Sequence, residues 1–287
     1  MPESEQTMFM RSNGISAEGT RDQYADGKAA KVWEIFIGDK KSRTKNYCDF
    51  LVNLLRNRGC RRILDVACGT GVDSIMLVEE GFEVVSCDAS DKMLKYALKE
   101  RWERRKDSKF DNWVIEEANW LTLYDDMREY LQGGFDAVIC LGNSFAHMLD
   151  NDGDQNQQKQ AIRNFERCLK PGGLLLIDHR NYDTICNGGS APSKSIYYNS
   201  QHMTDIKTSV LYVGGKPNIV TLDYLISTDE GISEFRLSYY PHQLEVFKKI
   251  LKEIFGYGCY HEIFGDFKEI NSNDTPAFYI HVIEKSK

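Results

Sequence analysis

Residues 63–76, Ile-Leu-Asp-Val-Ala-Cys-Gly-Thr-Gly-Val-Asp-Ser-Ile-Met, have the pattern of a buried strand, a glycine turn and the start of a helix. Gly69 and Gly71 allow the backbone to turn tightly and to approach a ligand without a Cβ in the way. Asp88 follows the apolar run 82–87, where its carboxylate can accept hydrogen bonds from ribose hydroxyls. Two strand ends of this kind at one edge of an open α/β sheet predict a site for an adenosine-bearing cofactor.

Two departures from the dinucleotide-binding fingerprint indicate which cofactor this is. The fingerprint has a third glycine three residues after the second, and this position is Ser74, so close helix–strand packing beside a pyrophosphate is not provided for. The turn also opens with Asp65, whose charge disfavours a doubly charged pyrophosphate and suits a ligand that carries an ammonium and a sulfonium. The sequence therefore favours S-adenosylmethionine over NAD. The alternative without function is that Gly69 and Gly71 only form a loop.

Two further apolar runs end in polar residues that we expect at the same edge of the sheet. Residues 135–140 lead into a second glycine turn, and residues 169–180 combine a helix end, a Pro-Gly-Gly turn and a buried strand. Ligands of open α/β sheets bind beyond the carboxyl ends of the strands. The residues that this rule places around one crevice are Ala67, Asp88, Asn143 and Arg180.

The middle of the chain alternates between strand and helix patterns, which predicts parallel strands joined by right-handed crossovers. The expected strands are 62–67, 83–88, 113–117, 136–141 and 173–178, and the expected helices are 42–58, 72–81, 91–106 and 156–169. Later segments are β-rich and read as the antiparallel strands of a cap, with a turn at 214–217. These segments are 195–198, 207–213, 219–227 and 234–240. A helix at 242–255 and a strand at 277–284 that returns to the main sheet complete the pattern.

The predicted fold class is α/β, a Rossmann-like methyltransferase sheet with helices on both faces, together with an antiparallel β cap and an N-terminal arm. A chain of 287 residues is long enough for one large domain with such an elaboration. The expected divisions are 1–45 as arm and lid, 46–185 as the S-adenosylmethionine-binding domain, 186–241 as the cap, and 242–287 as a helix and strand that complete the sheet.

Composition argues against several kinds of partner. The net charge of −7 disfavours nucleic acid, and we interpret the basic run at 99–109, which also holds acidic residues, as a solvated helix face. The eight cysteines have no Cys-x-x-Cys spacing, which favours free thiols in a reducing compartment and gives no support to a metal site. The polar first 20 residues do not have the pattern of a signal peptide, and no apolar stretch is long enough to span a membrane. We therefore expect a cytoplasmic protein without a metal, membrane or nucleic-acid partner.

Five segments, taken in order, resemble the animal glycine N-methyltransferases. They are Asp65-Val-Ala-Cys-Gly-Thr-Gly71, Val114-Ile-Glu-Glu-Ala-Asn-Trp120, Cys140-Leu-Gly-Asn-Ser-Phe-Ala-His147, Ile177-Asp-His-Arg-Asn-Tyr182 and Arg236-Leu-Ser-Tyr-Tyr-Pro-His242. Each segment alone occurs in many methyltransferases, whereas the ordered set with a β cap is specific, and the likeness runs from about Glu18 to the C-terminus. The resemblance implies a cytosolic homotetramer that methylates glycine to sarcosine with S-adenosylmethionine and binds folate as an inhibitor between subunits.

Arg180 and Asn143 are the residues that we expect to hold the amino acid. Glycine offers a carboxylate as its only strong handle, and a guanidinium clamps a carboxylate through two parallel hydrogen bonds, which a Lys cannot do. The alternative for Arg180 is an ion pair with Asp178 or Asp183 at the strand end. Asn143 and the carbonyl of Gly142 can accept hydrogen bonds from the substrate amine and so point its lone pair at the methyl group.

The resemblance implies roles for further residues at matching positions. The tyrosines that would crowd the sulfonium and the substrate are Tyr24, Tyr198, Tyr224 and Tyr239. The residues that match the family's cofactor contacts are Tyr24, Trp33, Arg43, Ala67, Gly69, Asp88, Asn119, Trp120, Leu141 and His147. Arg43 would pair with the carboxylate of the methionine part, and Glu18 would reach toward the neighbouring subunit's site. The structural alternative for the tyrosines and Trp120 is a core or interface position, and for His147 it is a helix start.

The sequence departs from the family at positions that bear on two of these expectations. Phe36 stands where the family usually has Tyr, which removes one hydroxyl near the site. The arm carries Met8 instead of the expected Tyr, and Asn218 and Ile219 replace a His-Met pair of the folate site, so folate inhibition stays an open question. The alternatives for the activity are methylation of sarcosine or another small amine, and a non-catalytic protein that binds S-adenosylmethionine or folate.

Overall fold

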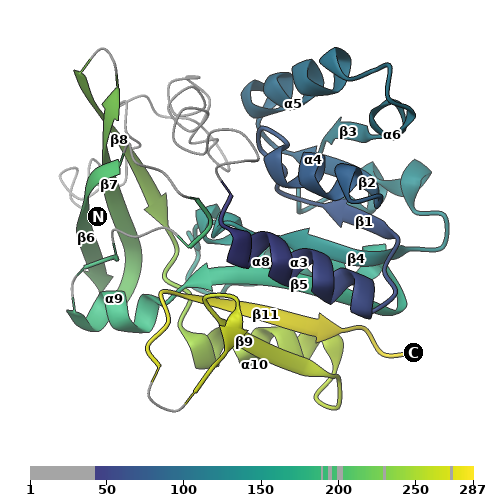
Figure 1. Cartoon of the computed structure of the whole chain (residues 1–287). Coiled ribbons are helices and arrows are strands. Elements are labelled where there is room, and N and C mark those ends of the chain that lie inside the picture. The colour runs from purple at the N-terminus through teal and green to yellow at the C-terminus, as the bar shows by residue number, and fades with distance from the viewer. Residues whose placement is uncertain (1–42, 189, 193–195, 199–202, 229–230, 272–273) are drawn as a thin grey trace.

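The structure is a computed structural model, and it describes residues 43–188, 190–192, 196–198, 203–228, 231–271 and 274–287. Two sheets organise these residues (Figure 1). The larger sheet has the strand order β10-β9-β11-β5-β4-β1-β2-β3, and the smaller has the order β6-β7-β8. The expected combination of a mostly parallel sheet with a separate antiparallel one is therefore confirmed.

In the larger sheet the neighbours from β5 to β3 are parallel. Its strands are β1 (Arg62–Asp65), β2 (Glu83–Asp88), β3 (Val114–Glu117), β4 (Phe135–Cys140), β5 (Leu169–Arg180), β9 (His261–Gly265), β10 (Lys268–Glu269) and β11 (Phe278–Glu284). β1 pairs in parallel with β2 and β4, whereas β11 runs antiparallel to both β5 and β9. The carboxyl ends of β1, β2, β3 and β4 consequently meet at one edge, where ligands of such sheets bind.

Helices cover both faces of the larger sheet. They are α3 (Lys45–Asn57), α4 (Val72–Glu79), α5 (Asp91–Glu103), α6 (Ser108–Asp111), α7 (Leu123–Asp126), α8 (Asn156–Cys168), α9 (Tyr182–Gly188) and α10 (Leu244–Phe255), with short 3-10 turns at Arg128–Tyr130 and Ser144–His147. Alternate strand residues face opposite ways: Ile63 packs with α3, α4 and α5, and the next residue, Leu64, packs with α8 and α10. This two-residue period explains why the strands read as continuous apolar runs.

The smaller sheet is a three-stranded meander with its own core. Its strands are β6 (Met203–Val213), β7 (Lys216–Thr228) and β8 (Gly231–Tyr239). The turn between β6 and β7 is Gly214–Gly215, and both glycines have positive φ, which a tight hairpin turn requires. Inward residues such as Leu222 and Leu237 pack on Tyr182 of α9, which follows β5 directly. This contact places the smaller sheet beside the end of β5 (Figure 1).

Some expected elements differ from the observed ones. The predicted strand at 195–198 is a single bridge between Arg43 and Tyr198 in the described residues. The strand predicted at 173–178 begins earlier, at Leu169, which pairs with Phe135. The register then shifts, so that the Pro-Gly-Gly segment of β5 lies between this pair and the pair of Leu174 with Ala137. Helix α9 and strands β9 and β10 were not predicted, since they are short and have little periodicity.

Candidate active site

The glycine turn between β1 and α4 is held by the end of the neighbouring strand. The N–H of Gly69 donates to Oδ2 of Asp88 at 2.9 Å, and the N–H of Ser90 donates to the other oxygen at 2.9 Å. Gly71 has a φ of 86°, and a Cβ at this position would lie 2.8 Å from the ring of Trp113. Glycine is therefore required here both for the left-handed backbone and for the close approach of α4 to the indole.

A cavity of about 650 Å³ lies beyond the carboxyl ends of β1, β2, β3 and β4, and we call it the strand-end cavity. It brings together ten of the predicted residues: Arg43, Ala67, Gly69, Asp88, Asn119, Trp120, Leu141, Gly142, His147 and Tyr198. The carboxylates in its lining are Asp73, Asp88, Glu117 and Asp126. Arg43 is the one Lys or Arg among the described lining residues. This excess of negative charge suits a cationic ligand and disfavours a pyrophosphate.

Asp65 was predicted at the mouth of the turn, but in the structure it is buried beneath the turn. Its Oδ2 accepts from the hydroxyl of Ser74 at 2.6 Å, Ser74 accepts from Ser86 at 2.8 Å, and Ser86 accepts from the indole N–H of Trp113 at 2.7 Å. Burial raises the pKa of Asp65 to about 7. The residue that replaces the third glycine of the fingerprint, Ser74, therefore serves as the donor to a buried carboxyl group.

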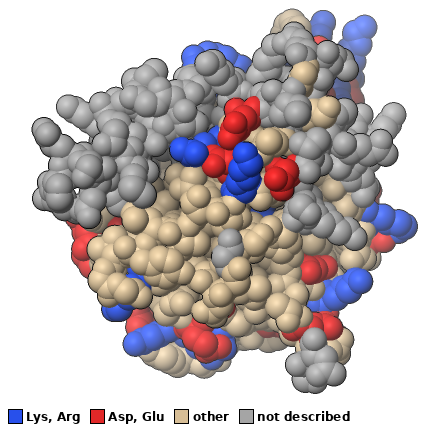
Figure 2. Space-filling view, turned by 90° about the vertical axis from the view of Figure 1, so that its left-hand side faces the viewer, with Lys and Arg blue, Asp and Glu red and all other residues tan. Residues whose placement is uncertain are grey.

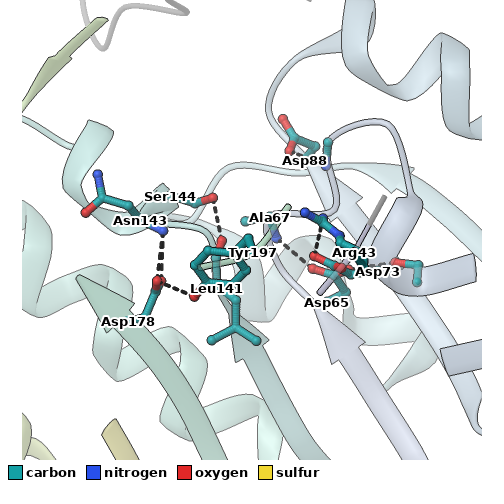
Figure 3. Close-up of polar contacts among 12 residues, drawn as sticks. Arg43, Asp65, Ala67, Asp73, Asp88, Leu141, Asn143, Ser144, Asp178 and Tyr197 are labelled. Carbon is teal, nitrogen blue, oxygen red and sulfur yellow. Dashed lines mark hydrogen bonds and ion pairs between the residues drawn. The ribbon is translucent and has the colours of Figure 1, made fainter. Parts of the chain in front are cut away.

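Arg43 is buried, and its guanidinium is only partly paired (Figure 3). Its Nη2 donates to Oδ2 of Asp73 at 2.8 Å, and the ring centroid of Tyr198 lies 4.5 Å from its Cζ. Nε and Nη1 of Arg43, Oδ1 of Asp73 and Oγ of Ser90 are buried without a hydrogen-bond partner among the described residues. An unpaired buried polar group costs about 1–3 kcal/mol. Because these residues line the strand-end cavity, a ligand with carboxylate, ammonium and hydroxyl groups fits it.

The aromatic part of the strand-end cavity is rigid and uncharged. The indole N–H of Trp120 donates to a backbone carbonyl at the end of β1 at 2.6 Å, and its ring stacks on Phe145. Oδ1 of Asn119 accepts from a backbone N–H two residues further on at 2.9 Å, which fixes the turn after β3. Burial lowers the pKa of His147 to about 4, so its ring is neutral at pH 7, and it contacts the ring of Tyr239 with centroids 4.7 Å apart.

The remaining described residues of the predicted site are not in the cavity lining but form a group beside it. They are Asn143, Arg180, Tyr224 and Tyr239, which we call the arginine cluster. Nη2 of Arg180 lies 3.5 Å from the hydroxyl of Tyr224, and the hydroxyls of Tyr224 and Tyr239 lie 2.9 Å apart. The guanidinium also packs on the ring of Phe278, 4.7 Å from its centroid. Nε of Arg180 is buried without a partner among the described residues.

The two carboxylates that were the alternative partners of Arg180 are bonded elsewhere. Asp178 accepts from the N–H of Asn143 at 2.9 and 3.1 Å and from the hydroxyl of Tyr197 (Figure 3). Asp183 accepts from the first backbone N–H of α10 at 2.9 Å. Burial raises the pKa of Asp178 to about 7. Within the described part of the chain Arg180 forms no ion pair with Asp or Glu, so the predicted alternative for it is wrong.

Asn143 connects the two groups of residues. It has a φ of 64°, and it follows Gly142 and precedes Ser144, both of which line the strand-end cavity. Its Oδ1 accepts from the N–H of Arg180 at 3.0 Å and from the hydroxyl of Tyr182 at 3.1 Å, and its Nδ2 lies 3.0 Å from the same hydroxyl. An amide oxygen accepts two hydrogen bonds. The structure therefore shows Asn143 holding the backbone of the arginine, a contact that the sequence did not indicate.

The predicted residues Tyr24, Trp33, Phe36, Glu18 and Met8 lie outside the described residues. Sequence reasoning also missed several residues that the structure brings to the site, namely Asp73, Ser90, Met93, Asp178 and Tyr197. The first three occupy the first turns of α4 and α5 or the residue before them, so the rule about carboxyl strand ends could have found them. Asp178 was named only as an alternative ion-pair partner of Arg180, and its contact with Tyr197 arises from tertiary packing, which no local signal marks.

Further observations concern the charged surface and the helices of the described residues. Within the basic run at 99–109, Arg104 at the end of α5 pairs with Glu79 and Glu100 at 2.8 and 3.0 Å. On the face shown in Figure 2, basic and acidic side chains stand together and much of the visible described surface is uncharged. Among the described residues no cluster of three or more His, Cys, Asp or Glu is arranged to hold a metal ion. None of the described helices has the length and apolar character needed to cross a membrane.

Comparison with known proteins agrees with this geometry. A family model described as "Methyltransferase domain" matches residues 58–221. The chain is 56% identical to glycine N-methyltransferase of Homo sapiens and 58% identical to that of Mus musculus, with 96% of this chain and 97% of the relative covered in both cases. A solved methyltransferase from Streptomyces caelestis shares the fold, with a TM-score of 0.66 at 15% identity over 95% of this chain and all of the other. The chain belongs to the glycine N-methyltransferase family of S-adenosylmethionine-dependent methyltransferases.

Proposed function

We propose that this protein transfers a methyl group from S-adenosylmethionine to the amino group of glycine, giving sarcosine and S-adenosylhomocysteine. The observation that carries the proposal is the guanidinium of Arg180, which has no acidic partner among the described residues and lies beside the strand-end cavity. A guanidinium in this state is ready to take a carboxylate through two hydrogen bonds. High identity to two mammalian proteins named glycine N-methyltransferase supports the same conclusion.

We assign the strand-end cavity to S-adenosylmethionine, which supplies a methyl group on a sulfonium when it is bound. The unpaired Nε and Nη1 of Arg43 are suited to its carboxylate, and Asp88 is suited to the ribose hydroxyls. Asn119 and Trp120 would flank the adenine. The remaining cofactor-site residues in this proposal are Tyr24, Trp33, Ala67, Gly69, Leu141 and His147. The neutral ring of His147 adds no positive charge beside a cation, which favours this arrangement.

We assign the arginine cluster to glycine. Arg180 would hold the carboxylate, and the carbonyl of Gly142 would accept a hydrogen bond from the amine. Oδ1 of Asn143 would accept a second bond from the amine when the hydroxyl of Tyr182, 3.1 Å away, turns to another partner, because the N–H of Arg180 already occupies one of its two lone pairs. The residues that would surround the amine and the methyl group are Tyr24, Tyr198, Tyr224 and Tyr239. The hydroxyls of Tyr224 and Tyr239, 2.9 Å apart, leave the cluster crowded, which favours an amino acid without a side chain.

The chemistry asked of these residues is alignment rather than covalent catalysis. Methyl transfer needs nitrogen, carbon and sulfur in line, and holding two reactants in such a geometry accounts for much of the barrier reduction. The amine attacks with its lone pair and must be neutral, so we expect activity to rise with pH into the alkaline range. Neither a metal ion nor a nucleophilic side chain has a part in this proposal.

The decisive test replaces Arg180 by Lys. A Lys keeps the positive charge but loses the two-pronged geometry, so we expect kcat/KM for glycine to fall about 100-fold, on the basis of 2–5 kcal/mol for a buried charged hydrogen-bonded pair. The dissociation constant for S-adenosylmethionine should stay within about twofold of the wild type, because Arg180 is not in the lining of the strand-end cavity. Mass spectrometry of the products identifies sarcosine, and calorimetry measures the dissociation constant.

A matched control is Arg236→Lys. Arg236 donates two hydrogen bonds to the carboxylate of Asp223, which is the contact proposed between Arg180 and glycine. Its side chain is half exposed on the smaller sheet. Glycine turnover should not change in this variant, because Arg236 lies neither in the lining of the strand-end cavity nor in the arginine cluster, and Lys keeps the positive charge beside Asp223. Unchanged turnover in Arg180→Lys, or equal kcat/KM for alanine and glycine in the wild type, would refute the proposal. Tight binding of S-adenosylmethionine without any methylated product would instead indicate a binding protein.

We further propose that the chain is a cytoplasmic homotetramer, with the arm and lid, cofactor domain, cap and C-terminal segment divided at about residues 45, 185 and 241. All eight cysteines are free thiols, five of them buried, which supports a reducing compartment. The tetramer rests on the family resemblance, and light scattering tests it. Folate binding rests on the same resemblance, against Asn218 and Ile219, and inhibition by a reduced folate in the glycine assay tests it.

A further inference from the structure

Three histidines form a hydrogen-bonded row across the antiparallel part of the larger sheet. Nε2 of His261 on β9 lies 3.0 Å from Nδ1 of His281 on β11, and Nε2 of His281 lies 3.0 Å from Nε2 of His179 on β5. Nδ1 of His179 lies 2.8 Å from the carbonyl oxygen of Arg180. His179 and His281 are fully buried, whereas His261 is partly exposed. The row thus runs from the surface to the backbone of the residue that we propose holds glycine.

The carbonyl at one end fixes the proton on every ring of the row. A carbonyl oxygen only accepts, so Nδ1 of His179 carries the proton and its Nε2, in the neutral ring, accepts. Nε2 of His281 therefore donates to His179, Nδ1 of His281 accepts, and Nε2 of His261 donates. Three neutral rings satisfy every hydrogen bond in the row, and only one combination of tautomers does so.

The surroundings keep the three rings neutral. Burial lowers the pKa of His179 to about 4. Burial and then the charges of Lys252 and Lys248 on α10 lower the pKa of His261 to about 4. For His281, burial is again the main cause, and its pKa is well below the usual value. The other titratable groups that face the row are His242, whose ring lies 6.2 Å from that of His179, and the hydroxyl-bearing rings of Tyr182 and Tyr279. None of these groups is a carboxylate that would favour a charged imidazole.

The backbone of Arg180 needs such a partner because of the sheet topology. The register of β4 and β5 ends where Cys140 pairs with Ile177, three residues before Arg180. At Arg180 side chains provide the hydrogen bonds: Asn143 accepts from its N–H at 3.0 Å, and His179 donates to its carbonyl at 2.8 Å. On the β4 side the main chain at Arg180 is therefore held by two side chains, one from the glycine turn after β4 and one from the row, whereas on its other side Arg180 pairs in register with Phe278 of β11.

We infer that His179 and His281 are positioning residues for methyl transfer. They hold the carbonyl of Arg180, and the backbone at Arg180 in turn sets where its side chain begins and where the guanidinium can lie. This inference rests on the proposed role of Arg180. Neither histidine is in the lining of the strand-end cavity, so both act through the backbone. Without the N–H of His281, the ring of His179 can shift its proton to Nε2, and a lone pair then faces the carbonyl in place of the hydrogen bond. The strand end of Arg180 is released from one of its two side-chain contacts.

The test compares two substitutions of His281. In His281→Leu the donor to His179 is lost, and we expect KM for glycine to rise about 3–10-fold, the range for one net hydrogen bond, with kcat and the dissociation constant for S-adenosylmethionine within about twofold. In His281→Gln the side chain carries a donor and an acceptor and should restore KM to within about twofold of the wild type. The control Val282→Ala removes buried volume from the same strand outside the row, so it should lower thermal stability and leave KM unchanged.

A spectroscopic measurement on the unaltered protein keeps the inference testable if His281→Leu fails to fold. Nitrogen-15 NMR of the selectively labelled wild type should show a protonated Nδ1 on His179 and protonated Nε2 on His281 and His261 at pH 7. A bare Nδ1 on His179, or a KM in His281→Leu equal to that of Val282→Ala, overturns the inference. Absence of glycine methylation in the wild type would instead refute the proposed function, so the two failures are distinguishable.

Discussion

The strand-end cavity and the arginine cluster each lie over one buried carboxyl group, but the two groups obtain their hydrogen bonds in different ways. Asp65 accepts from a backbone N–H two residues on and from Ser74 nine residues on. Asp178 accepts from Asn143 and Tyr197, 35 and 19 residues away. The hydrogen bonds of the first carboxyl group are thus contained in one strand–turn–helix unit, whereas those of the second exist only when three separate segments have packed together.

The largest expected effect is on the pH dependence of stability, because the two carboxyl groups share a raised pKa. Burial raises the pKa of both Asp65 and Asp178 from 3.8 in the unfolded chain to about 7. Between these values the folded protein binds more protons than the unfolded one, so the free energy of unfolding falls as pH rises. The stability that each protonated group contributes is complete below about pH 4 and is lost as pH passes through 7. Each group accounts for up to about 4 kcal/mol over this range.

Urea unfolding of Asp65→Asn and Asp178→Asn measures this dependence. An amide does not titrate, so the stability of each variant relative to the wild type should increase between pH 4 and pH 8, whatever constant cost the substitution has. The buried histidines have lowered pKa values and an opposite slope, which cancels in this difference because they are present in both proteins. If the relative stability increased with pH in one variant and not in the other, only one of the two carboxyl groups would have a raised pKa in the folded protein.

A smaller effect on the free energy of unfolding is expected from a substitution in the glycine turn between β1 and α4. In Gly71→Ala the new Cβ would meet the ring of Trp113 at 2.8 Å and the Cβ of Ala97 at 3.0 Å, on a backbone with a φ of 86°. Overpacking and left-handed strain together should cost about 2–4 kcal/mol of unfolding free energy. Gly81→Ala is the control, since its φ is 91° but a Cβ there meets nothing within 4 Å, so only the strain of about 1–2 kcal/mol applies. Equal losses in the two variants would mean that the indole moves aside freely.

The difference between the two sites also explains how much the sequence could predict. Gly69, Gly71 and Asp88 were recognisable because a strand, a turn and the next strand end follow one another along the chain, and the structure places all three at the turn or in the cavity wall. The parallel order of β1 to β5 followed from the same local alternation. Residues of the glycine turn and of the adjoining strand ends were predictable because the backbone geometry of a strand–turn–helix unit alone brings them together.

The arginine cluster was predictable only in its residue types. Arg180 was expected at a strand end, but its contact with Asn143, 37 residues away, depends on the pairing of β4 with β5, and its contact with the hydroxyl of Tyr224, 44 residues away, depends on the packing of the smaller sheet. The row of histidines spans 102 residues between His179 and His281, and although His179 lies in the segment 177–182, nothing in the sequence indicates that it contacts His281. The pairing of β11 with β5 places His281 near His179, and the short strand β9, whose sequence has too little periodicity to reveal it, places His261 near His281.

The smallest expected effects sharpen the comparison, because one donor is removed from each carboxyl group. Ser74→Ala removes a donor to Asp65 and should weaken S-adenosylmethionine binding about 3–10-fold, with KM for glycine unchanged. Tyr197→Phe removes a donor to Asp178 and keeps the ring contacts with Tyr47 and Phe267, so it should raise KM for glycine about 3–10-fold with little effect on S-adenosylmethionine binding. Calorimetry and glycine kinetics on both variants form the test. If Tyr197→Phe weakened both ligands equally, the carboxyl group of Asp178 would support the cavity as well as the cluster, since Gly142 and Tyr198 belong to the cavity wall and adjoin its two partners.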